Sequence, residues 1–218
     1  MTATEYDFWV LDLDGTIVDV QWPYVRETFD TLGDRLGRPF SDREATTLWY
    51  GLSESRDAYL ASLDVDRERF WRVFDDIEDP VRRAEATYLH DDARLLADVE
   101  APCGIVTHCR PRLTNAVLDH LDVRDWFDVV ICCNDDLGWK PDPDPVDRAV
   151  SQLSHATMSD NGILVGDSPC DIGAAWNAEL AAAHVERHSH ETRGQCVLAD
   201  HRIDSFDDLW RSATVAAD

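Results

Sequence analysis

The sequence predicts an α/β protein with an open, mostly parallel sheet and a helical insertion after the first strand. Two observations predict this class. Several short apolar runs end in polar residues, as buried parallel strands do, and plausible helix starts follow most of these runs. The long stretch after the first run shows helical periodicity instead. Strands that alternate with helices pair in parallel, so the runs are expected to form one sheet.

The predicted core strands are four apolar runs, at Phe8–Leu13, Cys103–Thr107, Val129–Cys133 and Ile163–Gly166. Helix starts follow three of them. Pro111 falls in a first helical turn, and both Asp144–Pro145 and Ser168–Pro169 pair an N-cap residue with proline at the first helical position. A further strand is expected near Ala181–Val185. The order of elements is therefore strand and helix in alternation.

The stretch from Asp19 to about His90 shows helical periods and no strand pattern, with breaks at Gly37–Pro39, Gly51–Ser53 and Asp79–Pro80. It is too long for a crossover connection, which usually needs one helix. We therefore expect an α/β core domain of residues 1–18 and 91–218 and a helical domain of residues 19–90. The expected helices lie near 24–36, 41–50, 54–62, 66–78 and 81–89, and another near 91–99 leads into the second strand.

The composition excludes several classes of protein. The chain has 218 residues, with 20 Lys+Arg against 44 Asp+Glu and a formal charge of −24. Because 44% of the residues are hydrophobic, a full core can form and a disordered acidic tail is excluded. No basic patch is present to bind nucleic acid, and no apolar run reaches the roughly 18 residues of a membrane span. The short acidic start, Met1–Asp7, is unlike a signal peptide, so we expect a cytoplasmic protein.

The basic residues are almost all arginine, and Lys140 is the single lysine. This bias favours a cytosol of molar salt, as in a halophilic archaeon, where electrostatic screening acts over about 3 Å and dense carboxylates keep the surface hydrated. The alternative is an acidic protein of an ordinary cytoplasm. A lysine retained in such a composition is expected to have a function.

Carboxylates gather where ligands bind in open α/β sheets, at the carboxyl ends of the strands. Asp12 and Asp14 follow the first predicted strand, and Asp167 follows the fourth, with Asp171 one helical turn further on. Four carboxylates and one lysine leave negative charge that needs a cation. Oxygen ligands without histidine or thiolate favour a hard divalent ion, most simply Mg²⁺. The arrangement predicts phosphoryl chemistry.

Four segments resemble the signatures of the haloacid dehalogenase-like hydrolase superfamily, in the family's order and over nearly the whole chain. They are the run DLDGTIVD from Asp12 to Asp19, Thr107, Lys140-Pro141, and the run GDSPCD from Gly166 to Asp171. The tail, Asp200–Leu209, resembles the family's last strand and final helix. The resemblance, strongest to the phosphoglycolate phosphatase-like branch, implies a Rossmann-like core and an all-helical cap domain.

The resemblance also implies catalytic roles. Asp12 is the expected nucleophile, forming an aspartyl-phosphate, and Asp14 the general acid and then base. Thr107 is expected to hold phosphate oxygens, and Lys140 to neutralise charge on the nucleophile and the transferring group. Dehalogenases expel a halide that needs no proton and lack an acid where Asp14 stands, so the resemblance favours a phosphatase.

Metal and substrate contacts follow from the same resemblance. The implied Mg²⁺ ligands are Asp12, the Asp14 carbonyl, Asp167 and Asp171. The implied phosphate or substrate contacts are Gly15, Thr16, Thr107, His108, Lys140 and, from the cap, Arg56. His108 either donates a hydrogen bond to phosphate or contributes only its backbone amide, and both alternatives stay open.

The cap is implied to select the substrate by closing over the site. Candidates for reading the organic part of the substrate are Trp22, Tyr50, Arg56 and Arg82, against the alternative that each serves ordinary cap packing. His184, His188 and His190 form a second cluster, which is either a further metal site or an exposed loop.

The sequence thus predicts Mg²⁺-dependent hydrolysis of a small phosphomonoester, such as phosphoglycolate or a sugar phosphate. One alternative is a phosphomutase of the β-phosphoglucomutase type, which uses the same core residues. Another is a non-catalytic binding protein on the same fold. The expected partner is a small phosphorylated molecule, with neither nucleic acid nor membrane, and the expected state is a monomer or homodimer.

Overall fold

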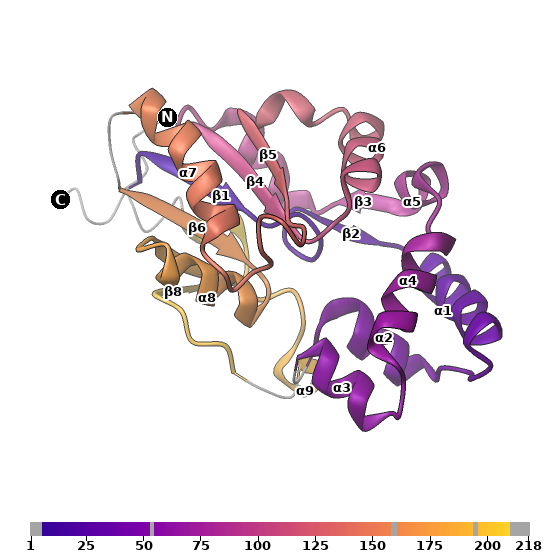
Figure 1. Cartoon of the computed structure of the whole chain (residues 1–218). Coiled ribbons are helices and arrows are strands. Elements are labelled where there is room, and N and C mark those ends of the chain that lie inside the picture. Colours follow the sequence, from indigo (N-terminus) through magenta and orange to yellow (C-terminus); the bar gives the residue numbers. More distant parts are fainter. Residues whose placement is uncertain (1–5, 53–54, 158–160, 194–195, 210–218) are drawn as a thin grey trace. The chain divides into compact units, whose positions relative to one another are not determined.

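A six-stranded parallel sheet organises the larger part of the chain in the computed structural model (Figure 1), which describes residues 6–52, 55–157, 161–193 and 196–209. The strands lie in the order β5-β4-β1-β6-β7-β8, and every neighbouring pair is parallel. Their bounds are β1 Phe8–Leu11, β4 Cys103–Thr107, β5 Val129–Cys132, β6 Gly162–Gly166, β7 Ala181–Val185 and β8 His201–Ile203. The predicted open parallel sheet is confirmed.

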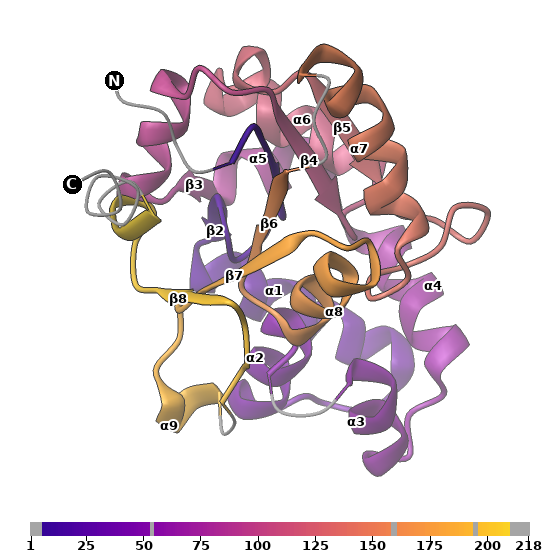
Figure 2. The ribbon, with the colours of Figure 1, turned by 90° about the vertical axis from the view of Figure 1, so that its left-hand side faces the viewer.

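Both faces of the central strand are buried, as expected for a parallel sheet. Phe8 and Val10 point to one face, where they join a hydrophobic cluster with side chains of α7 (Asp144–Thr157) and α8 (Pro169–Asn177). Both helices lie on the same side of the sheet in Figures 1 and 2. Trp9 and Leu11 alternate to the other face and are equally buried. The first strand is thus the centre of the α/β core.

The predicted helix starts are present. Pro111 is the first residue of α6 (Pro111–Leu121), and Pro169 is the first of α8. The Ser168 hydroxyl caps α8 by accepting from the Asp171 amide, while the Asp171 carboxylate accepts from the Ser168 amide. This reciprocal capping fixes where α8 begins, directly after the loop that follows β6.

The chain divides into two compact units. The α/β unit comprises Met1–Asp19, Leu89–Arg187 and Val197–Asp218, and the helical unit comprises Val20–Tyr88 and His188–Cys196. The helices of the second unit are α1 Trp22–Leu36, α2 Asp42–Tyr50, α3 Arg56–Ser62, α4 Arg67–Ile77, α5 Pro80–Ala86 and α9 His190–Arg193. The sequence-based division leaves residues 188–196 with the core domain, whereas here they cluster with the helices.

Phenylalanine rings hold the helical unit together. Phe29 packs edge-on against Phe40, and Phe70 stacks on Phe74, with ring centroids 5.5 and 5.9 Å apart. Glycines at Gly37 and Gly51 end α1 and α2 in the left-handed conformation, which glycine adopts without strain. None of the described helices is long and apolar enough to cross a membrane.

The expectation of no strand between Asp19 and His90 is wrong. β2 (Val18–Val20) and β3 (Thr87–Leu89) form a two-stranded sheet at the two ends of this stretch. Residues 87–89 were expected to be helical, but α5 ends at Ala86. Three-residue strands are too short to show a period, and their pairing depends on a partner far along the chain. The segment expected to be helical near 91–99 is the 3₁₀ helix η1, Asp91–Asp98.

Candidate active site

The carboxyl ends of three neighbouring strands supply the first residues of the site. Asp12 follows β1, Thr107 ends β4, and Asp167 follows β6, and all three side chains are buried. The Asp12 amide donates to the carbonyl of Val165 in β6 (2.9 Å), which continues the sheet register beyond the strand. Because β1 lies between β4 and β6, Asp12 is the central member of this group.

Lys140 reaches into the same group from the loop between β5 and α7. Its Nζ lies 2.6 Å from Asp12 Oδ1, 2.7 Å from Asp171 Oδ1 and 2.7 Å from the Val106 carbonyl oxygen. The side chain is only 2% exposed. All three ammonium donors therefore have acceptors at hydrogen-bond distance, which fixes the direction of the Asp12 carboxylate.

The loop that carries Lys140 is closed by its own hydrogen bonds. The Asn134 carboxamide oxygen accepts from the amides of Asp136 and Leu137, and the Asn134 carbonyl accepts from Gly138. On the far side of the lysine, Asn177 of α8 donates to the Pro141 carbonyl at 2.8 Å. Hydrogen bonds hold the backbone on both sides of Lys140, which restricts the position of its side chain.

Burial and charge act in opposite directions on this group. Burial raises the pKa of Asp12 to about 7, although the neighbouring Lys140 ammonium opposes the rise and Asp171 adds to it. The pKa of Lys140 is raised, since the two carboxylates outweigh the burial that would lower it. Lysine therefore stays charged, and a second cation close to Asp12 would favour the ionised form of this carboxyl.

The described carboxylates can hold that cation. One oxygen each from Asp12, Asp167 and Asp171 lie within 4.8 Å of one another, and all three residues are buried. One lysine cannot neutralise three carboxylates, so a divalent ion fits the charge, and an oxygen-only donor set fits Mg²⁺. Oδ2 of Asp171 already accepts from the Ser168 amide and hydroxyl, at 3.0 and 2.6 Å, which holds this side chain in place.

Two glycines make room for the carboxylates. A Cβ on Gly15, whose φ is +83°, would lie 2.7 Å from Oδ2 of Asp167. A Cβ on Gly166 would lie 2.3 Å from both Cβ and Cγ of Asp171. Both distances are too short for real contacts, so the close approach of carboxylate and backbone requires glycine at each position.

Asp14 lies on a tight turn after β1 and is partly exposed. The amides of Thr16, Ile17 and Val18 all donate to the Leu13 carbonyl, and the Gly15 amide donates to the Val18 carbonyl. Asp14 is outside the group of three carboxylates that could hold an ion. Asp14 is thus partly accessible, whereas Thr16 is fully buried.

The loop after β4 carries Thr107 and His108. Thr107 Oγ1 accepts from the Cys109 amide at 3.0 Å, which shapes the turn behind the strand. The His108 ring meets the Trp139 ring edge-on at 5.4 Å, and the Arg110 guanidinium lies 5.5 Å from the centre of the same ring. The structure thus places His108 next to Trp139, the residue before Lys140.

The four cap candidates all lie in the helical unit, and Arg56, Tyr50 and Arg82 make side-chain contacts there. Arg56 donates to the carbonyls of Leu48 and Trp49, both at 2.8 Å, and so closes the C-terminal end of α2. The Tyr50 ring contacts the His188 ring, with centroids 4.4 Å apart. The fourth, Trp22, is the first residue of α1 and is 36% exposed. For Arg56 and Tyr50, these contacts support the alternative that the side chain serves ordinary packing of the cap.

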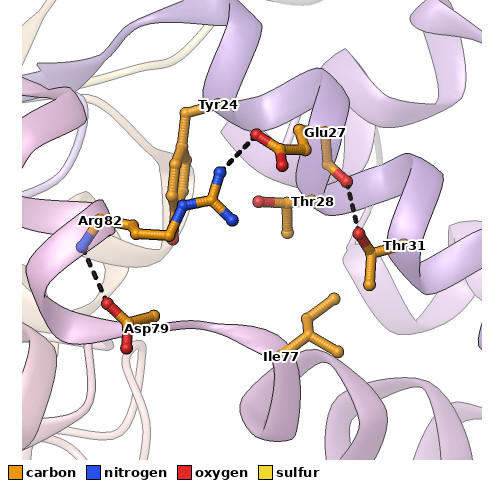
Figure 3. Close-up of a pocket in the computed structure, with 7 residues that line it drawn as sticks. All are labelled: Tyr24, Glu27, Thr28, Thr31, Ile77, Asp79 and Arg82. Atoms are coloured by element: carbon orange, nitrogen blue, oxygen red, sulfur yellow. Dashed lines mark hydrogen bonds and ion pairs between the residues drawn. The ribbon is translucent and has the colours of Figure 1, made fainter.

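Arg82 lines a small pocket of the helical unit together with Tyr24 and Glu27 (Figure 3). Its guanidinium pairs with Glu27 at 2.5 Å, and its amide donates to Asp79 Oδ1, as the dashed lines in Figure 3 show. Both ends of the residue are engaged within this unit.

Two of the three histidines, His184 and His188, lie in different environments. His184 is fully buried in β7, with Nε2 3.0 Å from the Asp167 carbonyl oxygen. His188 belongs to the helical unit, where burial and nearby Arg193 lower its pKa to about 4. The side chain of His190 lies outside the described residues. His184 supports the backbone of Asp167, a role that depends on the pairing of β6 with β7 and that the sequence did not indicate.

Comparison with known proteins identifies the family of the chain. The family model described as haloacid dehalogenase-like hydrolase matches residues 9–185. The chain belongs to this family. Among its relatives, the phosphoglycolate phosphatase of Nitrosococcus oceani is 25% identical over 191 residues, covering 78% of this chain and 80% of that protein. The pyrophosphatase PpaX of Bacillus pumilus is 26% identical over 200 residues, covering 89% and 88%.

A solved structure shows that the likeness extends to the fold. A haloacid dehalogenase-like family protein of Streptococcus pneumoniae superposes with a TM-score of 0.76 at 14% identity, covering 95% of this chain and 98% of that chain. Because the match covers nearly the whole of this chain, it includes residues of both units. The predictions of the family and of the fold are confirmed.

Proposed function

We propose that this hydrolase is a Mg²⁺-dependent phosphatase that cleaves a small phosphomonoester through an aspartyl-phosphate on Asp12. The observation that carries the proposal is the buried group in which Lys140 bridges Asp12 and Asp171 beside Asp167. An ion pair that only stabilised the fold would not need Asp167 as a third buried carboxylate. A metal site beside an oriented nucleophile would need it as a ligand.

In the first step, a carboxylate oxygen of Asp12 attacks phosphorus and the bond to the leaving oxygen breaks. Asp14 gives its proton to that oxygen, so the alcohol leaves neutral. In the second step, Asp14 takes a proton from water, and the hydroxide attacks the aspartyl-phosphate. Inorganic phosphate leaves and the Asp12 carboxylate is restored, so atoms and charge balance over the cycle.

Lys140 keeps the Asp12 carboxylate directed through the 2.6 Å contact and offsets charge that gathers on the transferring group. Thr107 and the amides that follow it are proposed to hold phosphate oxygens, together with Gly15 and Thr16 on the turn after β1. Asp12, the Asp14 carbonyl and Asp167 would hold Mg²⁺, with Asp171 as a further ligand or as support. When bound, Mg²⁺ supplies Lewis-acid stabilisation of negative charge on the phosphoryl oxygens.

We propose further that the helical unit is the cap that selects the substrate. The relatives named above, a phosphoglycolate phosphatase and a pyrophosphatase, support a small soluble substrate with a second anionic group. Arg56 and Arg82 make hydrogen bonds or ion pairs within their own unit, and Trp22 is 36% exposed, so we propose Trp22 as the first cap candidate to test.

The test is phosphate release from a panel of small phosphomonoesters and inorganic pyrophosphate, in molar KCl with Mg²⁺. Wild type is expected to release phosphate from at least one of them, and Asp12→Asn to release none while keeping its fold. Asp119→Asn, which changes an exposed acid paired with Arg124, is the matched control and should keep full activity. Full turnover by Asp12→Asn would refute the nucleophile, and isomerisation without release would identify a mutase.

A further inference from the structure

Arg187 connects three segments that are far apart in the sequence. It lies two residues after β7 and is about one-tenth exposed. Nη1 donates to Asp92 Oδ2 at 3.0 Å, and Nη2 donates to the Thr16 carbonyl at 2.8 Å. The guanidinium carbon also lies 5.5 Å from the centre of the buried Phe206 ring. Each of these contacts lies within the α/β unit.

Asp92 is itself held in place, so it can orient the arginine. Its Oδ2 accepts from the Phe206 amide at 2.9 Å as well as from Arg187. It also lies in the first turn of η1, where a negative charge is favourable. The Asp92 carboxylate, the Thr16 carbonyl and the Phe206 ring therefore define the orientation of the Arg187 guanidinium.

The acceptor, Thr16, lies on the turn that carries Asp14. The other hydrogen bonds given above close that turn upon itself, between Leu13, Gly15 and Val18. The bond from Arg187 instead ties the turn to a remote part of the same unit. Thr16 is fully buried, so loss of this donor would cost its carbonyl a hydrogen bond that water cannot readily replace.

We propose that Arg187, oriented by Asp92, is a positioning residue that holds the Asp14 turn in its catalytic geometry. Thr16 is two residues after Asp14, so a shift of its carbonyl moves the backbone that carries the acid. Arg187 acts through this turn and makes no contact with the phosphoryl group in this scheme. The inference rests on the proposed function, because it assigns a consequence to the general acid.

The contacts of Arg187 lie next to the two short strands β2 and β3. Thr16 is two residues before β2, and Asp92 is three residues after β3. The His90 amide also donates to the Ile17 carbonyl at 3.0 Å. Arg187 and Asp92 thus hold the chain next to β2 and β3, where the segment 20–88 of the helical unit begins and ends.

The test compares two substrates that differ in their need for an acid. The leaving group of p-nitrophenyl phosphate departs without protonation, whereas that of an alkyl phosphate requires it. Arg187→Met and Asp92→Asn should lower kcat/KM about 10- to 100-fold for the alkyl ester and less than about threefold for the aryl ester. Arg187→Lys, which can reach one acceptor at a time, should recover part of the loss.

The matched control is Arg124→Met, which removes an arginine bonded to Asp119 and Asn115 away from the turn and should change neither substrate. Equal losses on both esters, or no loss, would overturn the inference. Amide hydrogen exchange offers a readout free of activity, since the amides of Thr16–Val18 should exchange faster in Arg187→Met, and unchanged exchange would also overturn it.

The same panel separates failure of the inference from failure of the proposed function. Asp14→Asn should show the same preference for the aryl ester. If Asp14→Asn lowers kcat/KM equally for both esters, the acid role is wrong and the inference falls with it. If Asp14→Asn discriminates and Arg187→Met does not, the proposed function stands and the inference alone is wrong.

Discussion

Replacement of Lys140 by methionine tests the central ion group of the site. Methionine keeps most of the apolar stem and removes the ammonium, which lies 2.6 Å from Asp12 and 2.7 Å from Asp171. Both carboxylates are buried, so neither can exchange the lost partner for water. Breaking a buried pair in this way costs about 3–5 kcal/mol of unfolding free energy. For a protein of this size that corresponds to a fall in Tm of about 6–20 °C.

The assay is thermal unfolding followed by far-ultraviolet circular dichroism, in molar KCl with a chelator so that no divalent ion replaces the lost charge. Arg124→Met is the control, because its ion pair with Asp119 is exposed and should be worth less than about 1 kcal/mol. Phosphate release by Lys140→Met should be lost in the presence of Mg²⁺.

The double variant Lys140→Met/Asp171→Asn sharpens the test. It removes one of the two carboxylates that the single variant leaves without compensation, so it should regain about 1 kcal/mol or more of the loss. A cost of less than about 1 kcal/mol for Lys140→Met alone would refute the reasoning, since that is the range of an exposed pair.

Three further predictions follow from the same structure. Gly15→Ala and Gly37→Ala both place a side chain at positive φ, at about 1–2 kcal/mol each. Only the first meets a neighbour, Asp167 at 2.7 Å, whereas Gly37 has no described atom within 4 Å of the new Cβ, so phosphate release should fall in Gly15→Ala alone. Burial would raise the pKa of Asp92, but bonds from Arg187 and a backbone amide lower it below the usual 3.8. Its stabilisation is therefore present above that pH and lost on further acidification, and Arg187→Met should flatten the acid limb of the stability curve. Finally, the charge of −24 predicts a lower Tm below about 0.5 M KCl, where screening weakens, and an unchanged Tm in dilute buffer would contradict salt adaptation.

Much of the α/β unit could be predicted because its signals are local. The strands β4 and β7 have the predicted bounds, and the starts of α6 and α8 coincide with Pro111 and Pro169. A buried strand is an apolar run and a helix start is a capping residue followed by proline, so neighbours in the sequence suffice to recognise them. The short strands β2 and β3 escaped recognition because their signal lies in pairing alone.

The residues of the candidate site were recognisable for a related reason. Parallel strands align their carboxyl ends, so polar residues placed after apolar runs are expected to lie close together, and Asp12 and Asp167 do. Lys140 could be singled out because it is the single lysine of an acidic chain. The sequence by itself therefore determined the fold class, the family and the set of residues around the strand ends.

Only the tertiary structure decided how these residues act on one another. It placed the Lys140 ammonium between Asp12 and Asp171. It also showed that Arg56 bonds to the C-terminal end of α2 and that His184 contacts the Asp167 carbonyl. The bond from Arg187 to Thr16 joins residues 171 positions apart. Such contacts depend on the register and packing of whole elements, and no local pattern of residues specifies which distant donor meets which carbonyl.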